Sequence, residues 1–409
     1  MCTEREFTPL GLGKSNSRAK LRCFMNVGDE VVVDISGIAH GGHCVSRFEG
    51  RVIFVRHAIP GEKVKVRITD ISKSFARGDC IEVLSASKDR VTPPCTYAHP
   101  GGCGGCDFQH ISTPAQRKLK AEIIKEQFSR LAKKSIDVEV EEVKPNLGWR
   151  SRMEFTVSQN GRLAMYESRR NNLIEISECK IADPKVDIGG INSRKLPIGK
   201  KIDVAVGTTG DVVTSIEGRE NIALIKQEVA GFEFSISPDS FWQSHTAAPQ
   251  TLLAVVMEMS GLRQGDHFYD LYSGVGLFAS GALSLVGPGG RITMIEESGS
   301  SITDARRNFA NYETVEVIEG KVERELSKFV RGDVVVLDPP RAGAGERVIK
   351  SIAALNPRTI VYVACDPAAL ARDTAILEAR GYELDAIRAF DLFPMTQHIE
   401  SVARFIRSE

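Results

Sequence analysis

Residues 267–276 read HFYDLYSGVG, an apolar run that ends in a glycine-rich turn. Two later segments have the same form, DVVVLDPPR at residues 333–341 and TIVYVACDP at residues 359–367. Each is a predicted strand that finishes on glycines or on side chains that carry chemistry. Ligands of open α/β sheets bind beyond the carboxyl ends of the strands, so these three strand ends mark a candidate site.

Strand-like and helix-like segments alternate from a long helix expected near Ala247 to Glu409, which predicts a doubly wound, Rossmann-like parallel sheet. Residues 27–85 instead show short alternating runs separated by glycine turns, which predicts a small OB-like β-barrel. A second strand-rich stretch runs from Trp149 to about Ile236. Because 409 residues exceed what one core usually holds, we expect an α/β domain combined with β-rich domains.

The composition is that of a globular protein, with 42% hydrophobic and 26% charged residues. The chain shows no 18-residue apolar window and no secretory signal, so we expect a cytoplasmic location and no membrane partner. A net charge of zero removes any global argument for nucleic-acid binding. A local basic surface survives, because seven cations between Arg117 and Lys134 face only Glu122 and Glu126; a solvated helix face is an equal alternative.

Nine cysteines in a chain without an export signal are expected to be thiols, catalysts or metal ligands. Cys95, Cys103 and Cys106 lie in one glycine-rich loop, and Cys179 is the nearest candidate for a fourth soft ligand. One C-x-x-C pair with two solitary cysteines favours an iron–sulfur cluster over zinc, with His99 as a competing ligand. Unrelated buried thiols are the remaining alternative.

The turn at Gly274 and Gly276 lets the main chain approach a ligand closely, although a plain strand-to-helix turn would have the same sequence. The next predicted strand ends at Glu296, 26 residues after Asp270, where a carboxylate can bind both hydroxyls of a ribose. Asp338 is fixed at a third strand end beside two prolines. These residues predict a site for an adenosine-type cofactor.

Cys365 follows its strand at a point where a thiolate can add to an electron-poor ring carbon and make the neighbouring carbon nucleophilic. Glu400 enters the last predicted strand and is the candidate base, because partial desolvation raises a carboxyl pKa into the range suited to proton abstraction. His398 is a competing base. The alternative for Glu400 is an exposed carboxylate at the start of a strand.

Together these segments resemble the RNA 5-methyluridine methyltransferase family over nearly the whole chain. The resemblance rests on the cysteine loop and on FWQ at 241–243, DLYSGVG at 270–276, DPPR at 338–341, CDPAALARD at 365–373 and HIES at 398–401. It implies S-adenosylmethionine contacts from Gln243, Asp270, Tyr272, Gly274, Gly276, Glu296 and Asp338. It also implies a four-iron (4Fe-4S) cluster on Cys95, Cys103, Cys106 and Cys179, with Cys365 as nucleophile and Glu400 as base.

The same resemblance implies four parts of the chain. They are a flexible basic arm at 1–20, an RNA-binding TRAM barrel at 21–88, a central α+β iron–sulfur domain at 89–106 and 135–240, and a methyltransferase domain at 107–134 and 241–409. Three features depart from the family pattern. Leu277 stands just after the glycine turn, where the family often has Asn. Lys321 lies in a region where the family often offers Asn or Asp to the adenine. The first cysteine gap is longer than in the best-known members of the family.

The implied reaction is methylation of carbon-5 of a uridine in ribosomal or transfer RNA through a covalent cysteine–uracil intermediate. RNA is the implied partner, and no obligate protein partner is implied. A 5-methylcytosine enzyme is one alternative, although such enzymes usually have Pro directly before the nucleophile, where this chain has Ala364. A non-catalytic RNA-binding protein is another, and the combination of Cys365, Glu400 and Asp338 argues against it.

Overall fold

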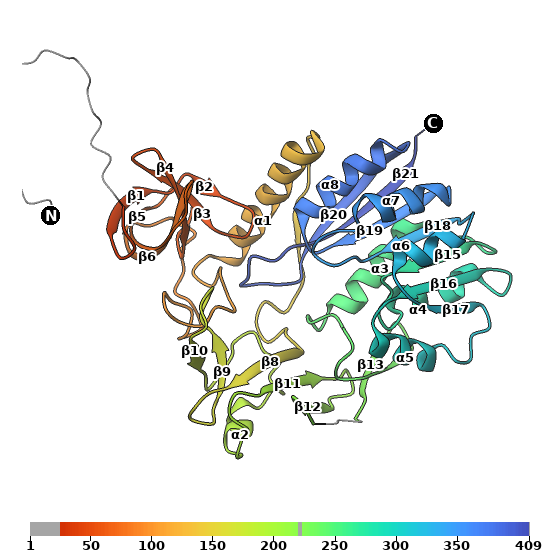
Figure 1. Ribbon diagram of the computed structural model, residues 1–409, viewed down its shortest axis with the longest axis horizontal. Coiled ribbons are helices and arrows are strands. Elements are labelled where there is room, and N and C mark those ends of the chain that lie inside the picture. The colour runs from red at the N-terminus through yellow and green to blue at the C-terminus, as the bar shows by residue number, and fades with distance from the viewer. Residues whose placement is uncertain (1–24, 220–222, 409) are drawn as a thin grey trace, which may run out of the picture.

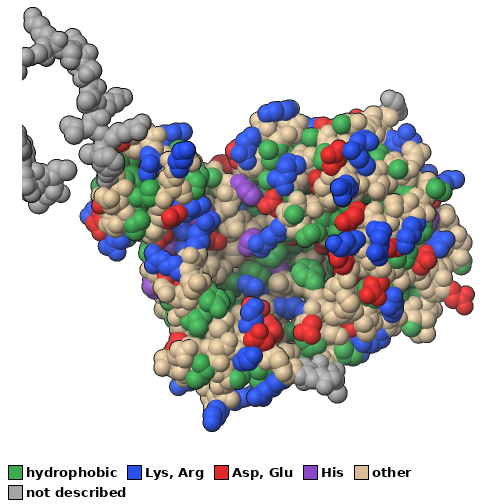
Figure 2. Space-filling view, viewed as in Figure 1, with side chains coloured by type: hydrophobic (Ala, Val, Ile, Leu, Met, Phe, Trp, Pro, Cys, Tyr) green, Lys and Arg blue, Asp and Glu red, His purple; other side chains and the backbone are tan. Residues whose placement is uncertain are grey.

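The computed structural model describes residues 25–219 and 223–408 as a barrel, a central sheet and a large α/β unit (Figure 1). The predicted basic arm at residues 1–20 lies outside the described residues. Figure 2 shows that the three units surround a hollow lined by many Lys and Arg side chains. Across the part of the chain that the structure describes, no helix has both the length and the apolar character needed to cross a lipid bilayer.

The barrel is one six-stranded sheet in the order β1-β5-β6-β4-β3-β2. Its strands are β1 (Glu30–Asp34), β2 (Gly37–Ile38), β3 (Cys44–Phe48), β4 (Arg51–Arg56), β5 (Lys63–Ile71) and β6 (Phe75–Ser85). Burial alternates along β5, because successive side chains point to opposite faces of a strand, so Val64, Val66 and Ile68 fill the interior. The predicted OB-like barrel is confirmed.

The central sheet has the strand order β10-β9-β8-β11-β12. Its elements are β8 (Arg152–Val157), β9 (Leu163–Tyr166), β10 (Leu173–Glu175), β11 (Lys201–Val206), β12 (Val212–Ile216) and the short helix α2 (Ile188–Asn192). One face carries a separate apolar core that includes Phe155, Leu163, Ile202 and Val204. This sheet therefore folds around its own core, beside the barrel and the large unit.

The large sheet has the order β17-β16-β15-β18-β19-β21-β20-β7. Its strands are β15 (His267–Leu271), β16 (Arg291–Glu296), β17 (Val315–Glu319), β18 (Val334–Leu337), β19 (Thr359–Ala364), β20 (Tyr382–Asp391), β21 (Glu400–Arg407) and β7 (Val140–Glu142). Strands β15 to β19 pair in parallel, while β21 is antiparallel to both its neighbours. No helix separates β20 from β21, and strands joined directly run antiparallel.

Helices cover both faces of this sheet, which confirms the doubly wound fold (Figure 1). One face is covered by α3 (Ala248–Ser260), α4 (Leu277–Val286) and α5 (Gly299–Asn308). The other is covered by α1 (Thr113–Gln127), continued by the π-helical turn η1 (Phe128–Ala132), and by α6 (Val322–Glu325), η2 (Leu326–Lys328), α7 (Gly345–Ala354) and α8 (Pro367–Glu378). Alternate strand residues, such as Phe268 and Tyr269, serve the two cores.

The domain boundaries differ from the prediction in two places. Residues 135–240 were expected in the central domain, but β7 pairs with β20 at the edge of the large sheet. The hairpin of β13 (Ile225–Val229) and β14 (Phe232–Ile236) buries Phe234 and Ile236 in the core shared by α3, α4 and α5. Both segments are strands whose apolar faces can be buried against either unit, so their sequence pattern does not decide which one they join.

Candidate active site

The carboxyl ends of β15, β18 and β19 lie side by side at the same end of the large sheet. The sheet is built outwards from β15, through β16 and β17 on one side and through β18 and β19 on the other. Ligands of doubly wound sheets bind at such a switch point. The structure therefore places Gly274, Asp338 and Cys365, which directly follow these strands or their first turn, at one edge.

Glu400 lies next to Cys365 because of the register between β21 and β19. The two strands are antiparallel and Ala364 pairs with Ser401, so the first residue of β21 meets the residue that follows β19. Burial, and then the negative charges of Glu400 and Asp338, raise the pKa of the Cys365 thiol to about 12. The free thiol is therefore protonated at neutral pH, and its ionisation calls for nearby positive charge.

Glu400, which is buried, and Asp338, which is partly buried, form a pair of interacting carboxyl groups. Only 3% of Glu400 is exposed, so the alternative of an exposed strand-start carboxylate is wrong. Burial raises the pKa of Asp338 to about 7, and burial together with Asp338 raises the pKa of Glu400 well above its usual value. Within the described residues, Glu400 Oε1 has no hydrogen-bond partner. Two carboxyl groups so placed resist carrying two charges at once, and the pair is suited to hold a proton near neutral pH.

Polar groups surround the glycine turn after β15. Asp270 is fully buried, burial raises its pKa well above the usual range, and its Oδ2 accepts the amide of the third residue of α4 at 2.9 Å. Glu296 Oε2 accepts the Gly274 amide at 2.9 Å. Gln243 Nε2 donates to Asp338 Oδ2 at 3.4 Å, which brings the segment before α3 to the end of β18. All five of these predicted cofactor residues therefore lie around the carboxyl ends of the central parallel strands.

The two glycines of the turn are required for different reasons. Gly274 has φ +54°, and a Cβ there would meet nothing within 4 Å, so this face is open to a ligand. Gly276 has φ +98°, and a Cβ there would overlap the Phe309 ring and approach Met294. Gly276 therefore permits close packing inside the protein. The predicted close approach of main chain to a ligand applies to Gly274.

Tyr272, Leu277 and Lys321 are the remaining residues considered for contact with the cofactor, and each has a different environment. Tyr272 follows β15 with φ +59°, a left-handed conformation that is uncommon for a residue with a side chain. Leu277 begins α4, is 7% exposed and belongs to the core, so it does not offer a polar contact. Lys321 lies 3.7 Å from Glu297 across an ion pair, beside an open cavity at the end of β17.

A cavity of about 220 Å³ lies against Cys365. Its walls come from the large unit and from the barrel, and they include Arg341, Cys365, Gln397, His398, His40 and Gly41. Burial, with Arg341, lowers the pKa of the His398 ring to about 4. A ring with so low a pKa holds a proton poorly, which favours Glu400 over His398 as the base.

Sequence comparisons place the chain in a family. The TRAM domain model matches residues 25–81, and the model described as tRNA (Uracil-5-)-methyltransferase matches residues 319–407. An uncharacterized RNA methyltransferase of Streptomyces avermitilis is 39% identical, and the match covers 92% of this chain and 98% of that protein. The chain belongs to the tRNA (uracil-5-)-methyltransferase family of RNA methyltransferases. A relative of Bifidobacterium longum with the same description is 36% identical over 92% of this chain and 96% of its own length.

A solved structure confirms the fold of this RNA methyltransferase. The tRNA (uracil-54, C5)-methyltransferase of Pyrococcus abyssi, in complex with S-adenosyl-L-homocysteine, superposes with a TM-score of 0.71 and 22% identity. The match covers 92% of this chain and 100% of that chain. The Rossmann-like sheet and the barrel described above therefore belong to a known architecture.

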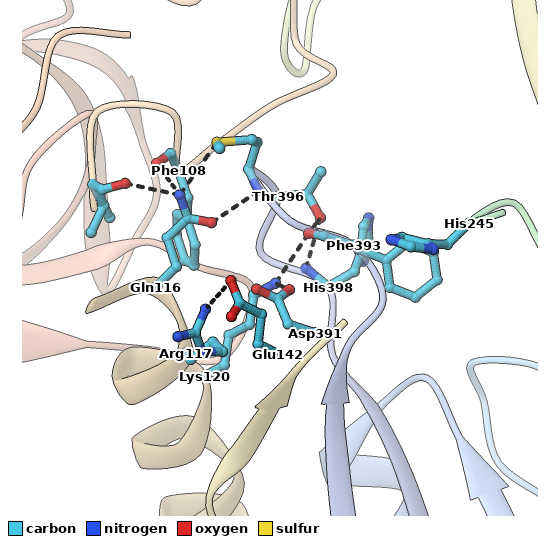
Figure 3. A network of polar contacts seen from close by, with 12 residues as sticks. Phe108, Gln116, Arg117, Lys120, Glu142, His245, Asp391, Phe393, Thr396 and His398 are labelled. Atoms are coloured by element: carbon cyan, nitrogen blue, oxygen red, sulfur yellow. Dashed lines mark hydrogen bonds and ion pairs between the residues drawn. The ribbon is translucent and has the colours of Figure 1, made fainter. Parts of the chain in front are cut away.

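Helix α1 of this RNA methyltransferase holds the loop at 392–399, which leads into Glu400 (Figure 3). Gln116 Oε1 accepts the Met395 amide at 2.9 Å. Lys120 Nζ donates to Asp391 Oδ1 at 2.6 Å and to the Phe393 carbonyl at 3.1 Å. The helix thus fixes both the start and the middle of the loop that carries His398.

Lys120 corrects one part of the sequence analysis. It was counted among the cations of a local basic surface, or else of a solvated helix face, but its side chain is fully buried. Burial lowers its pKa, while Asp391 opposes that effect. A signal was present in the sequence, because Gln116, Lys120 and Ile123 recur at the spacing of one helix face, and all three are buried.

The four candidate cluster ligands lie together. Cys95, Cys103, Cys106 and Cys179 line one cavity of about 30 Å³ between the cysteine loop and the central sheet. Burial raises the pKa of Cys103, Cys106 and Cys179, to about 12 for Cys106. His99, the competing ligand, is exposed and bonds to the adjacent carbonyl at 2.9 Å. In residues 25–219 and 223–408, no three His, Cys, Asp or Glu side chains are grouped to hold a single metal ion.

Proposed function

We propose that this RNA methyltransferase methylates carbon-5 of a uridine, with S-adenosylmethionine as the methyl donor. The observation that carries the proposal is the register of β19 and β21, which sets the buried Glu400 beside Cys365, a residue that lines a polar cavity. A nucleophile next to a base suits covalent attack on a ring followed by proton removal. The TRAM barrel and the description of the matching family model support RNA and uracil as the substrate.

The switch-point residues fit the donor. S-adenosylmethionine supplies the methyl group, and its sulfonium charge favours the ionised forms of neighbouring acids. Among the described residues, Asp270 Oδ1 and Ser273 Oγ are buried without hydrogen-bond partners, beside the open face of Gly274. Glu296 ends β16, where a carboxylate can accept ribose hydroxyls. The S-adenosyl-L-homocysteine in the Pyrococcus abyssi relative supports this assignment.

The chain's own residues then act in order. A uridine turns out of its stack into the cavity, because a stacked base is out of reach of the thiol. Cys365 loses its proton to solvent, helped by the charge of Arg341, and its sulfur bonds to carbon-6 of uracil. The addition leaves the electron pair of the former carbon-5–carbon-6 double bond on carbon-5, which would take the methyl group from the donor as the donor's methyl–sulfur bond breaks and S-adenosylhomocysteine is released. Glu400 then removes the carbon-5 proton, the sulfur–carbon bond breaks, and the Cys365 thiolate is restored.

Replacing the nucleophile tests the covalent step. Cys365→Ala is expected to abolish 5-methyluridine formation, because carbon-5 is not activated without the sulfur, while S-adenosylhomocysteine binding by calorimetry is kept. Cys365→Ser serves as the matched control of similar shape. Turnover by Cys365→Ala would remove the covalent step from the mechanism.

Replacing the base tests its separate role. Glu400→Gln is expected to stop the reaction after methyl transfer, so a methylated RNA adduct accumulates on Cys365. The adduct is seen as a shifted band on a denaturing gel, and the double change Cys365→Ala with Glu400→Gln must lack it. Full activity of Glu400→Gln without an adduct would exclude Glu400 as the base.

We also propose that Cys95, Cys103, Cys106 and Cys179 hold a four-iron cluster. Four soft donors line one cavity, and one C-x-x-C pair with two solitary cysteines suits a cluster held by thiolates. The reaction above needs no electron transfer, so the cluster's role is to join the cysteine loop to the central sheet. Iron and sulfide analysis of anaerobically purified protein tests this. Zinc in place of iron, or neither, would refute it.

The RNA that carries the target uridine is sought by mapping. Ribosomal and transfer RNA from cells that lack this protein are to be compared with RNA from cells that contain it. Loss of 5-methyluridine at one position identifies the substrate. Loss of 5-methylcytidine instead would refute the uridine assignment.

A further inference from the structure

The barrel contributes to the cavity beside Cys365. The loop between β2 and β3, residues 39–43, is held by internal hydrogen bonds, with the Ala39 amide donating to the His43 carbonyl at 2.8 Å and the Gly42 amide to the Ala39 carbonyl at 3.0 Å. At the tip of this loop, His40 and Gly41 form part of the cavity wall. An element of the RNA-binding unit thus lies at the active site.

This contact is built by close packing. Gly42 has φ +73°, and a Cβ there would overlap the Gln397 side chain and lie 3.2 Å from the Phe108 ring. Gln397 belongs to the loop that leads into Glu400. The glycine therefore allows the barrel loop to rest on the active-site loop at a distance that no other residue permits.

His40 is held in one orientation by a carboxylate. Its Nε2 lies 3.0 Å from Asp366 Oδ2, and Asp366 Oδ1 accepts the Ala369 amide at 2.8 Å as the N-cap of α8. Among the described residues, no hydrogen bond engages the other ring nitrogen, Nδ1. The side chain is 39% exposed and lines the cavity.

Asp366 favours the charged form of the His40 ring. The hydrogen bond to Asp366 raises the pKa of His40, which burial opposes, and Arg130 of η1 and Glu126 of α1 exert smaller, opposite effects. Arg341 contributes a cation to the same cavity wall. An imidazolium fixed on one side by a carboxylate is a charge-assisted donor on the other, and such donors bind anionic oxygens most strongly.

We propose that His40 binds a phosphate oxygen of the target nucleotide through its Nδ1–H group, while Asp366 holds its Nε2. The inference rests on the proposed function, because the phosphate belongs to the uridine that Cys365 attacks. A nucleotide that enters the cavity base first leaves its phosphate at the mouth, where His40 lies, and its ring near Cys365, which is half-buried. The barrel thereby anchors the reacting nucleotide itself as well as distant RNA.

The test measures binding of a fluorescein-labelled ten-nucleotide oligouridine by anisotropy at several salt concentrations. Each phosphate neutralised by a cation adds about 0.7 to the slope of log K against log salt for single strands. His40→Asn keeps a donor for Asp366 but has no charge. It is expected to weaken binding roughly tenfold and to lower the slope by about 0.7, since one charge-assisted contact is lost.

Two controls separate this from a structural role. His40→Lys, which keeps a cation, is expected to restore the slope. Lys65→Gln removes a barrel cation already paired with Glu82 at 2.7 Å and is expected to leave the slope unchanged. If His40 only ties the barrel to α8, then His40→Asn binds with the wild-type slope, and the inference is overturned. A lower melting temperature with an unchanged slope has the same meaning.

The assay involves no methyl transfer, so the two proposals fail separately. If His40→Asn weakens binding as expected but the wild-type protein forms no 5-methyluridine, the proposed function is refuted. Wild-type protein that forms 5-methyluridine, with His40→Asn binding as the wild type does, refutes the phosphate contact alone.

Discussion

Removing the buried Lys120 ammonium is expected to unfold the loop at 392–399 and to weaken the whole large unit. Lys120 is fully buried, 1% of the Asp391 side chain is exposed, and the two are joined at 2.6 Å. Breaking such a pair on one side costs about 3–5 kcal/mol, because a charge is left buried without its partner. The Phe393 carbonyl also loses its donor at 3.1 Å, which adds about 1 kcal/mol.

Lys120→Met keeps most of the length of the side chain without its charge and is the variant of choice. Urea unfolding should give a free energy of unfolding lower by about 4–6 kcal/mol, the sum of these two losses. Hydrogen exchange should show faster exchange at residues 392–399. The methylation rate should fall as well, because the loop that leads into Glu400 is no longer fixed to α1.

The matched control lies on the same helix. Lys125 pairs with Asp137 at 2.9 Å, but the two side chains are 42% and 97% exposed, so Lys125→Met should cost less than about 1 kcal/mol. The double change Lys120→Met with Asp391→Leu should recover most of the stability, because no lone charge stays buried. Equal unfolding free energies for Lys120→Met and Lys125→Met would refute the reasoning.

Other substitutions test the cofactor turn and the barrel. Gly276→Ala should destabilise the protein by roughly 2–4 kcal/mol in urea, through overlap with Phe309 and the strained φ, whereas Gly274→Ala should fold with a smaller loss yet bind S-adenosylhomocysteine more weakly in calorimetry. Burial acts to raise the pKa of Glu62, but hydrogen bonds from Arg90 and from two backbone amides outweigh it, and the net pKa is lowered. Its stabilisation is therefore present above the unfolded-state pKa and is lost as pH falls through the folded-state pKa. Glu62→Gln should lower the free energy of unfolding by about 2–3 kcal/mol at pH 7, and this difference from the wild type should shrink towards pH 3. A difference that stays constant with pH would contradict this.

The strands that carry the site could be predicted because their sequences are unambiguous. Apolar runs such as residues 334–337 and 359–364 are buried on both faces, as parallel strands between two helix layers must be. Their carboxyl ends meet at one edge of the sheet, so Asp338 and Cys365 could be placed together without knowing the register. The neighbouring position of Glu400 required more, because it depends on β21 running antiparallel beside β19.

The parts that sequence reasoning missed depend on contacts between distant segments. A lysine on an amphipathic helix is normally solvated, and the burial of Lys120 is made tolerable by Asp391, 271 positions away, together with the Phe393 carbonyl. The barrel loop with His40 has no periodicity that would indicate where it docks. The three-residue strand β7 is too short for any pattern, and its partner β20 lies near the other end of the chain.

Strand β7 affects both how the enzyme can be truncated and how it folds during synthesis. Val140–Glu142 covers the outer edge of β20 at Ala389–Asp391. A fragment beginning at residue 241 would lack this cover and would present open main-chain groups that recruit other chains into aggregates. During synthesis, by contrast, the covering strand leaves the ribosome long before β20 does. The last edge of the sheet therefore has its partner waiting when it emerges.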